Sequence, residues 1–177
     1  MLKLGADTRL NPPEPDSAAN GSAGSLRPVA LVTGAARRLG REIALGFARS
    51  GWDVAVHYRR SAHEAHETVA QLQALGVRAA CFEADLALES ACDGLLDAVI
   101  AELGVPRCLV NNASLFEHDT PATVSAARLD QHLAPNLMAP LRLSARLYQA
   151  TPEDARGVVV HLSVSYTHLR AHETDSY

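Results

Sequence analysis

The segment VALVTGAARRLG, from Val29 to Gly40, has the pattern of a strand, a tight turn and the start of a helix. Residues 29–33 form a short apolar, β-branched run without polar alternation, which is typical of a strand buried on both faces in a parallel sheet. Gly34 ends the run and permits a tight turn, and Gly40 lets the following helix approach the strand closely. The same pattern of elements continues along the chain.

Strand-like and helix-like stretches alternate from Val29 to Leu162, which is the signature of βαβ units. The expected strands are residues 29–33, 53–58, 77–82, 107–111 and 157–162. The expected helices are one that carries Leu39, Ile43 and Phe47 and ends at Gly51, then residues 62–75, 88–103, about 122–134 and about 136–149. We therefore predict an α/β fold, a doubly wound, Rossmann-like parallel sheet of about five strands that is incomplete at its C-terminal side. Ligands bind such sheets at the carboxyl ends of the strands.

Composition excludes several classes of protein. The chain has 177 residues, 47% of them hydrophobic and 20% charged, with a net charge of −4, so binding to nucleic acid through bulk positive charge is not expected. No apolar run approaches the roughly 20 residues that span a bilayer, and no secretory signal is visible. The three cysteines form neither a disulfide framework nor a metal knuckle, so we expect a cytoplasmic protein without a metal site or a membrane partner.

The turn after the first expected strand favours a dinucleotide. Gly34 and Gly40 frame a helix N-terminus whose free N–H groups and positive dipole end suit a pyrophosphate. At the end of the second strand, His57-Tyr58-Arg59-Arg60-Ser61 contains no acid for a ribose 2′-OH. Two guanidinium groups and a hydroxyl suit a 2′-phosphate instead, so we predict NADP(H) rather than NAD. A solvated basic turn is the alternative.

Several motifs resemble those of the short-chain dehydrogenase/reductase family in order and spacing. They are TGAARRLG at 33–40, HYRRS at 57–61, ADL at 84–86, NNAS at 111–114 and Asn136, and the resemblance runs from about Val29 to Leu162. Arg38 stands where most family members have glycine. The combination is most similar to pteridine reductases and their dihydrofolate- or dihydromonapterin-reducing bacterial relatives.

The resemblance implies a role for each matching residue. The pyrophosphate turn would consist of Gly34, Arg37, Arg38, Leu39 and Gly40, and the 2′-phosphate would be surrounded by His57, Tyr58, Arg59, Arg60 and Ser61. Asp85 and Leu86 would flank the adenine. Asn112, Ala113 and Ser114 would support the ribose. Arg38, Ser114 and Phe116 would contact the substrate, where an aromatic ring can stack on a pterin.

Asn136 is the matching catalytic asparagine, whose carbonyl holds a water of the proton relay in the family. Pro140 lies four residues later and has no N–H to donate to that carbonyl within a helix. A helix kink with Asn136 used for packing is the alternative.

The pattern departs from the family after the fifth expected strand. The family's Ser or Asp position falls on Val164, and Tyr166 to Arg170 matches Tyr-x-x-x-Lys imperfectly and too close to that strand. Residues 164–177 resemble translated sequencing-adaptor read-through. We therefore expect a disordered leader at 1–27, a partial NADP-binding domain at 28–163 and a non-native or disordered tail at 164–177.

Three functions are compatible with these features. The first is an NADPH-dependent short-chain reductase of a pterin, dihydrofolate-like or related carbonyl or imine substrate, present here as an inactive fragment whose full-length parent is a homo-oligomer. The second is a non-catalytic NADP(H)-binding module. The third is a fragment without a function of its own.

Overall fold

A computed structural model describes residues 27–116 and 125–163 of the chain. Within these ranges, strands and helices alternate as the sequence predicts. In chain order the elements are β1 (Val29–Val32), α1 (Arg38–Arg49), β2 (Asp53–Tyr58), α2 (Ala62–Ala74), β3 (Ala79–Glu83), α3 (Glu89–Leu103), β4 (Pro106–Asn111), α4 (Ala126–Leu133), the π-helical turn η1 (Ala134–Met138), α5 (Ala139–Ala150) and β5 (Val158–His161).

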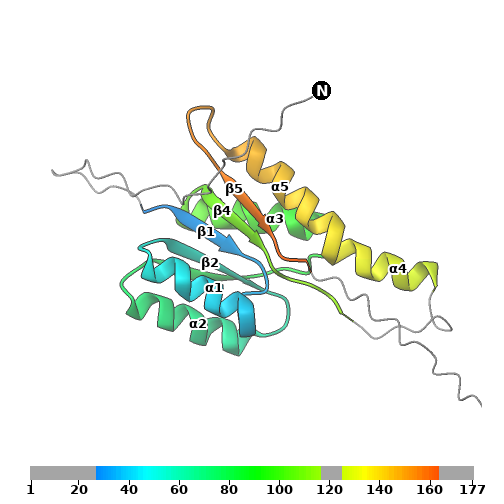
Figure 1. The fold of residues 1–177 in the computed structure, drawn as a ribbon, viewed down its shortest axis with the longest axis horizontal. Coiled ribbons are helices and arrows are strands. Elements are labelled where there is room, and N and C mark those ends of the chain that lie inside the picture. The colour runs from blue at the N-terminus through cyan, green and yellow to red at the C-terminus, as the bar shows by residue number, and fades with distance from the viewer. Residues whose placement is uncertain (1–26, 117–124, 164–177) are drawn as a thin grey trace, which may run out of the picture.

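The five strands form one parallel sheet in the order β3-β2-β1-β4-β5 (Figure 1). This confirms the predicted doubly wound, Rossmann-like fold. From β1 the chain moves outward through β2 to β3, then returns to the other side of β1 for β4 and β5. The strand order therefore reverses between β1 and β4, and the crevice for a ligand lies outside the carboxyl ends of these strands.

The central strand β1 is buried on both faces because helices cover each side of the sheet. Ala30 and Val32 pack into the cluster formed with α1 and α2. Val29 and Leu31 pack into the opposite cluster, formed with α3 and α5. Since side chains alternate between faces along a strand, an unbroken apolar run is what a two-sided core requires.

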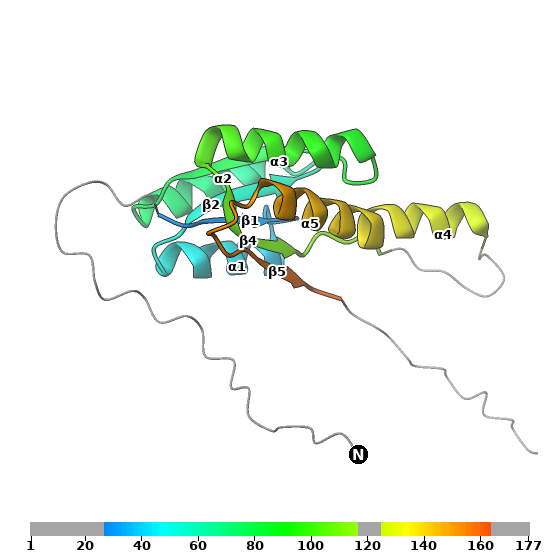
Figure 2. The ribbon, with the colours of Figure 1, turned by 90° about the horizontal axis from the view of Figure 1, so that it is seen from above.

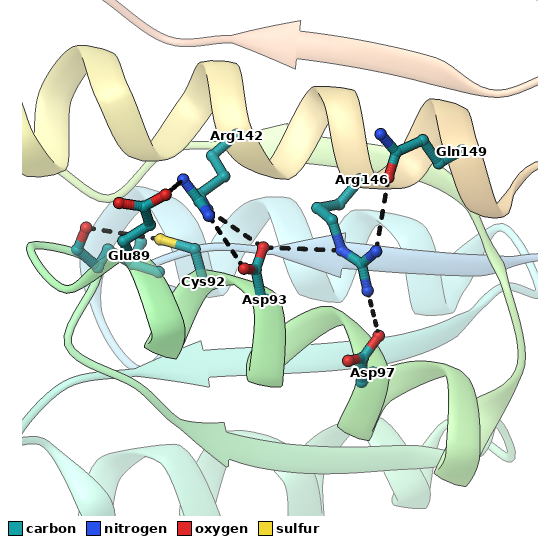
Figure 3. A network of polar contacts seen from close by, with 8 residues as sticks. Glu89, Cys92, Asp93, Asp97, Arg142, Arg146 and Gln149 are labelled. Atoms are coloured by element: carbon teal, nitrogen blue, oxygen red, sulfur yellow. Dashed lines mark hydrogen bonds and ion pairs between the residues drawn. The ribbon is translucent and has the colours of Figure 1, made fainter.

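A ladder of charged side chains connects α3 with α5 along the outer surface (Figure 3). Arg142 donates to Asp93 over 3.2 and 3.1 Å and also pairs with Glu89. Arg146 reaches Asp97 at 2.6 Å and Asp93 at 3.6 Å. The hydrogen bonds from Arg142 hold the pKa of Asp93 below its ordinary value. The ladder aligns α5 on α3, and thereby fixes η1, which borders the candidate site.

The segment from α4 to α5 is one helical run, which corrects the expectation of two separate helices (Figure 2). The chain widens at η1, where the N–H of Ala139 bonds to the carbonyl of Ala134, five residues earlier. Pro135 and Pro140 remove two helical N–H donors, and the π turn absorbs this mismatch without ending the helix. The expected helix residues 122–124 lie outside the described residues.

β5 is an edge strand of the described sheet. Its valines and the following Leu162 are all exposed, with Val158 at 55%. The outer backbone edge of β5 has no strand partner among the described residues, and unpaired groups at such an edge favour association.

The expected leader and tail lie almost entirely outside the described residues. The exception is Arg27, whose guanidinium donates to the carbonyl of Gly76. None of the helices in the described ranges is long and apolar enough to cross a membrane.

We predict that Leu143→Ala lowers the free energy of unfolding by about 2–5 kcal/mol, because Leu143 is fully buried between α5 and the sheet. Leu141→Ala, on the exposed side of the same helix, is the control and should change it by less than about 0.5 kcal/mol. Urea unfolding followed by circular dichroism measures both. Equal losses would contradict the burial of α5 against β4.

Candidate functional site

A cavity of about 470 Å³ opens at the carboxyl ends of β1, β2 and β4. This volume lies within the range of ligand-binding clefts. Every residue that the sequence assigns to cofactor contact lines the cavity, and Ala36, Ala84, Leu115 and Pro135 complete its wall. The structure thus brings together motifs that are up to 80 positions apart in the sequence, as Gly34 and Ser114 are.

The turn between β1 and α1 leaves no room for side chains at its glycines. A Cβ on Gly40 would lie 2.3 Å from the carbonyl oxygen of Gly34 and 2.6 Å from Asn112 Nδ2. Gly34 has φ +65° and faces Ala113. These glycines therefore allow the N-terminal end of α1 to press against β1 and β4, as predicted.

Arg38 adopts an unexpected backbone conformation in the same turn. Its φ of +52° makes it the only non-glycine residue in the left-handed region within the described ranges. Such a conformation costs on the order of 1–3 kcal/mol for a residue with a Cβ. The sequence shows an arginine where the family has glycine, but the strain is visible only in the structure.

Thr33 and Asn112 join the turn to β4. The Thr33 hydroxyl oxygen accepts from the backbone N–H groups of Asn112 and Ala113 at 2.9 and 3.0 Å. Asn112 Nδ2 donates to the carbonyl of Thr33 at 2.8 Å. Sequence reasoning assigned no role to Thr33, although a polar residue ending an apolar strand is a signal for such a contact.

The N-terminal end of α1 presents unpaired donors to the cavity wall. Arg37 precedes the helix in an extended conformation; no side chain of the described residues caps it, and the first turn holds no acid. Arg37, Arg38, Leu39 and Gly40 all line the cavity. Free N–H groups and the positive end of the helix dipole make this wall suitable for an anion.

A basic corner borders the same cavity at the end of β2. It consists of residues 59–61 (Arg-Arg-Ser), with Arg37 nearby across the turn. Arg59 lies 3.9 Å from Asp85, and Arg37 lies 3.5 Å from Glu64. These ion pairs are partly exposed, so solvent weakens them and the guanidinium groups can exchange partners for a phosphate.

His57 and Tyr58, which the resemblance places around the 2′-phosphate, use their polar side-chain atoms in contacts within the protein. Both ring nitrogens of His57 bond to backbone groups, and its side chain is buried. The Tyr58 hydroxyl donates to Glu83 at 3.4 Å, and desolvation together with Glu83 raises its pKa. Both residues line the cavity, but their polar atoms face the protein.

Asn136 fixes η1 to the loop after β4. Its Oδ1 accepts from the N–H of Leu115 at 2.7 Å, and its Nδ2 donates to the carbonyl of Leu115 at 2.8 Å. The side chain therefore pairs with backbone, and the relay role that the resemblance implies for the main-chain carbonyl of Asn136 stays a prediction. Asn136 does not line the cavity, although the neighbouring Pro135 does.

The residues expected at the substrate side are only partly brought together. Arg38 and Ser114 line the cavity. Phe116 is 67% exposed and lies outside the lining. Val164, Tyr166 and Arg170 lie outside the described residues, so the expected departure from the family's proton-donor motif is not described.

Asn111 is a further feature that sequence reasoning missed. It is buried at the end of β4, and neither its Oδ1 nor its Nδ2 has a hydrogen-bond partner among the described residues. A buried amide without partners is costly, so this position requires a water or another polar group.

These features define a nucleotide-binding α/β domain whose site lies at the point of strand-order reversal. The sequence model of the short chain dehydrogenase family matches residues 28–177. The chain belongs to this family of oxidoreductases.

Similar proteins have been characterised in bacteria. FolM alternative dihydrofolate reductase 1 from Brucella suis, solved in complex with NADP, is 37% identical, with a TM-score of 0.71 over 76% of this chain and 56% of that one. A short chain dehydrogenase from Burkholderia cenocepacia, also with NADP, is 35% identical, with a TM-score of 0.70 over 76% and 55%. The short-chain dehydrogenase/reductase homolog YusS of Bacillus subtilis is 36% identical over 59% of this chain and 96% of its own length.

The chain spans about half the length of these two solved structures and of several other curated relatives that it matches.

We predict that Gly40→Ala lowers the free energy of unfolding by about 2 kcal/mol or more, because the added methyl group overlaps backbone atoms of the turn. Gly46→Ala is the matched control in the same helix, where a Cβ meets nothing within 4 Å. It should stabilise the protein by up to about 1 kcal/mol through helix propensity. Denaturant unfolding compares the two variants; a neutral Gly40→Ala would contradict the close approach of α1.

Proposed function

We propose that the cavity binds NADPH and that the chain carries the cofactor-binding part of a short-chain reductase. The observation that carries this proposal is one continuous cavity that joins the uncapped N-terminal end of α1 to the basic corner at 59–61. NADPH carries a pyrophosphate and, at a distance from it, a 2′-phosphate. It therefore needs two anion sites within a single cleft. The NADP complexes of the Brucella suis and Burkholderia cenocepacia proteins support the assignment.

The residues present fit this cofactor. The free N–H groups at the start of α1 would hold the pyrophosphate, with Gly34 and Gly40 shaping the turn, and Arg59, Arg60 and Ser61 would hold the 2′-phosphate. Asp85 and Leu86 would flank the adenine, and residues 112–114 would support the nicotinamide ribose. When bound, NADPH supplies a hydride from its nicotinamide ring.

A pterin or dihydrofolate-like compound is the substrate class that we propose for the full reductase. The support is the similarity to a protein described as an alternative dihydrofolate reductase, together with Arg38 in place of glycine in the turn. The strained backbone of Arg38 supports a functional role for this residue at the cavity, because such strain is often retained at functional sites. Ser114 lies on the same cavity wall, and the exposed Phe116 follows it.

This sequence does not contain a complete set of groups for delivering a proton to the substrate. Reduction of a C=N or C=O bond needs a proton donor whose pKa is tuned by its surroundings. No Tyr-x-x-x-Lys occurs in the printed sequence, whose only lysine is Lys3. We propose that this chain binds NADPH without completing turnover. The same observation favours a second candidate function, an NADP(H)-binding module without catalysis.

We predict that Arg59→Ala combined with Arg60→Ala removes most of the preference for NADP⁺ over NAD⁺. Loss of charge-assisted hydrogen bonds to the 2′-phosphate should weaken NADP⁺ at least tenfold, since each contributes about 1.5–3 kcal/mol. The affinity for NAD⁺ should stay within about twofold, because NAD⁺ lacks that phosphate. Isothermal titration calorimetry on the full 177-residue chain measures both dissociation constants.

Arg49→Ala serves as a control for the loss of a positive charge away from the cavity, since Arg49 lies at the far end of α1. It should leave both affinities unchanged. An unchanged NADP⁺ to NAD⁺ ratio in the double variant would refute the role of the basic corner.

We also predict that the purified chain does not oxidise NADPH in the presence of dihydropterin or dihydrofolate substrates. The loss of NADPH absorbance over time measures turnover, and the full-length Brucella suis protein is the positive control. Sustained substrate-dependent oxidation by this chain would show that another group delivers the proton.

A further inference from the structure

We propose that His57 is a positioning residue that holds the pyrophosphate-binding turn in place, and that it is not a ligand of the 2′-phosphate. This inference rests on the proposed NADPH site and adds a division of roles within the HYRRS motif. His57 lies two positions before the arginine pair and belongs to the same strand end, so the sequence groups it with the phosphate-binding residues. Its contacts assign it a different partner.

His57 joins three segments that converge on the cavity. Its Nδ1 accepts from the backbone N–H of Gly34 at 3.1 Å. Its Nε2 lies 3.0 Å from the carbonyl of Ala84, beyond the end of β3. Its own carbonyl accepts from the N–H of Ala35 at 2.9 Å. One residue of β2 therefore binds two successive N–H groups of the turn after β1 and the segment after β3.

These contacts define one protonation state of the ring. A carbonyl can only accept, so Nε2 must carry the proton that bonds to Ala84. The N–H of Gly34 can only donate, so Nδ1 must be bare. The ring is 2% exposed, and burial lowers its pKa to about 4, while the bond to Ala84 and the charge of Asp85 act in the opposite direction. At neutral pH the imidazole is uncharged and has no donor left for a phosphate.

The position of Gly34 explains why this bond matters for cofactor binding. Gly34 has φ +65° and begins the turn that leads into the cavity-lining residues 36–40 at the start of α1. If the His57 ring no longer accepts from the N–H of Gly34, this part-buried donor has no partner. The turn can then rotate until the N–H finds another acceptor. The donors at the start of α1 then leave the position that the pyrophosphate requires.

This mechanism makes a prediction that separates His57 from the arginines. The pyrophosphate is common to NADP⁺ and NAD⁺, whereas Arg59 and Arg60 are proposed to contact a phosphate that only NADP⁺ carries. A change at His57 should therefore weaken both dinucleotides by the same factor and leave their ratio unchanged.

Two substitutions separate the two ring contacts. In His57→Asn the amide oxygen can take the place of Nδ1 and accept from Gly34, while the bond to Ala84 is lost. In His57→Gln the amide nitrogen can take the place of Nε2 and donate to Ala84, while the bond to Gly34 is lost. Each variant gives up one hydrogen bond, so they form a matched pair. The unfolding midpoint of each controls for a general loss of stability.

Calorimetric titration of the full chain with NADP⁺ and with NAD⁺ is the binding experiment. We expect His57→Asn to bind both within about threefold of the unsubstituted chain. We expect His57→Gln to bind both about tenfold more weakly, as the loss of one buried hydrogen bond implies, with an NADP⁺ to NAD⁺ ratio unchanged within about twofold. A fall in that ratio, or equal affinities in the two variants, would overturn the proposal.

A ligand-free measurement makes the outcome independent of the cofactor assignment. Nitrogen-15 NMR should find Nδ1 unprotonated and Nε2 protonated at neutral pH, and the Gly34 amide signal should move strongly in His57→Gln and little in His57→Asn. If the unsubstituted chain bound neither dinucleotide, the proposed function would fail, and with it the role in cofactor binding. A protonated Nδ1, or a Gly34 signal insensitive to His57→Gln, would refute the positioning contact itself.

Discussion

The close contact between α1 and the turn that precedes it is the constraint on which the site depends. At Gly40 the helix approaches the carbonyl of Gly34 and the amide of Asn112 so closely that no Cβ fits. The same amide of Asn112 donates to the carbonyl of Thr33, at the end of β1. Helix, central strand and β4 are therefore fixed to one another where the strand order reverses. This places the free donors of α1 at the edge of the sheet where α/β proteins bind ligands.

Electrostatics complements this geometry at the other end of the cavity. The chain carries a net charge of −4, yet four arginines (Arg37, Arg38, Arg59 and Arg60) line the cavity at the turn and at the end of β2. Glu64 and Asp85 pair loosely with Arg37 and Arg59. These acids keep the guanidinium groups near the cavity and partly offset their charge, so an incoming phosphate must replace an existing partner. Selectivity for a phosphate then comes from the stronger, bidentate geometry that guanidinium forms with it.

The sequence predicts the fold well because the responsible signals are local and periodic. The apolar run at β1 and the glycines at 34 and 40 act through backbone sterics and burial, which depend little on distant residues. The inward direction of His57 and the pairing of Asn136 with Leu115 could not be predicted in this way. Each of these contacts joins segments more than 20 positions apart, and the motif alone does not show which way a polar side chain points. The π turn at 134–138 accompanies Pro135 and Pro140, but the two prolines alone did not show that the helix continues through them, and the left-handed φ of Arg38 is visible only in the structure.

The residues that line the cavity belong to a different part of the chain from the expected proton donor. Within the described residues, all lining positions fall between Gly34 and Pro135, and β5 contributes none of them. The two corners proposed to bind anions depend on β1, β2 and β4, which pack under α1, α2, α3 and α5 in continuous cores. The resemblance implies a proton relay that includes Asn136, and a proton donor that lies after the fifth strand. The proposed cofactor contacts and the expected proton donor therefore belong to different parts of the chain, and the former depend on β1, β2 and β4.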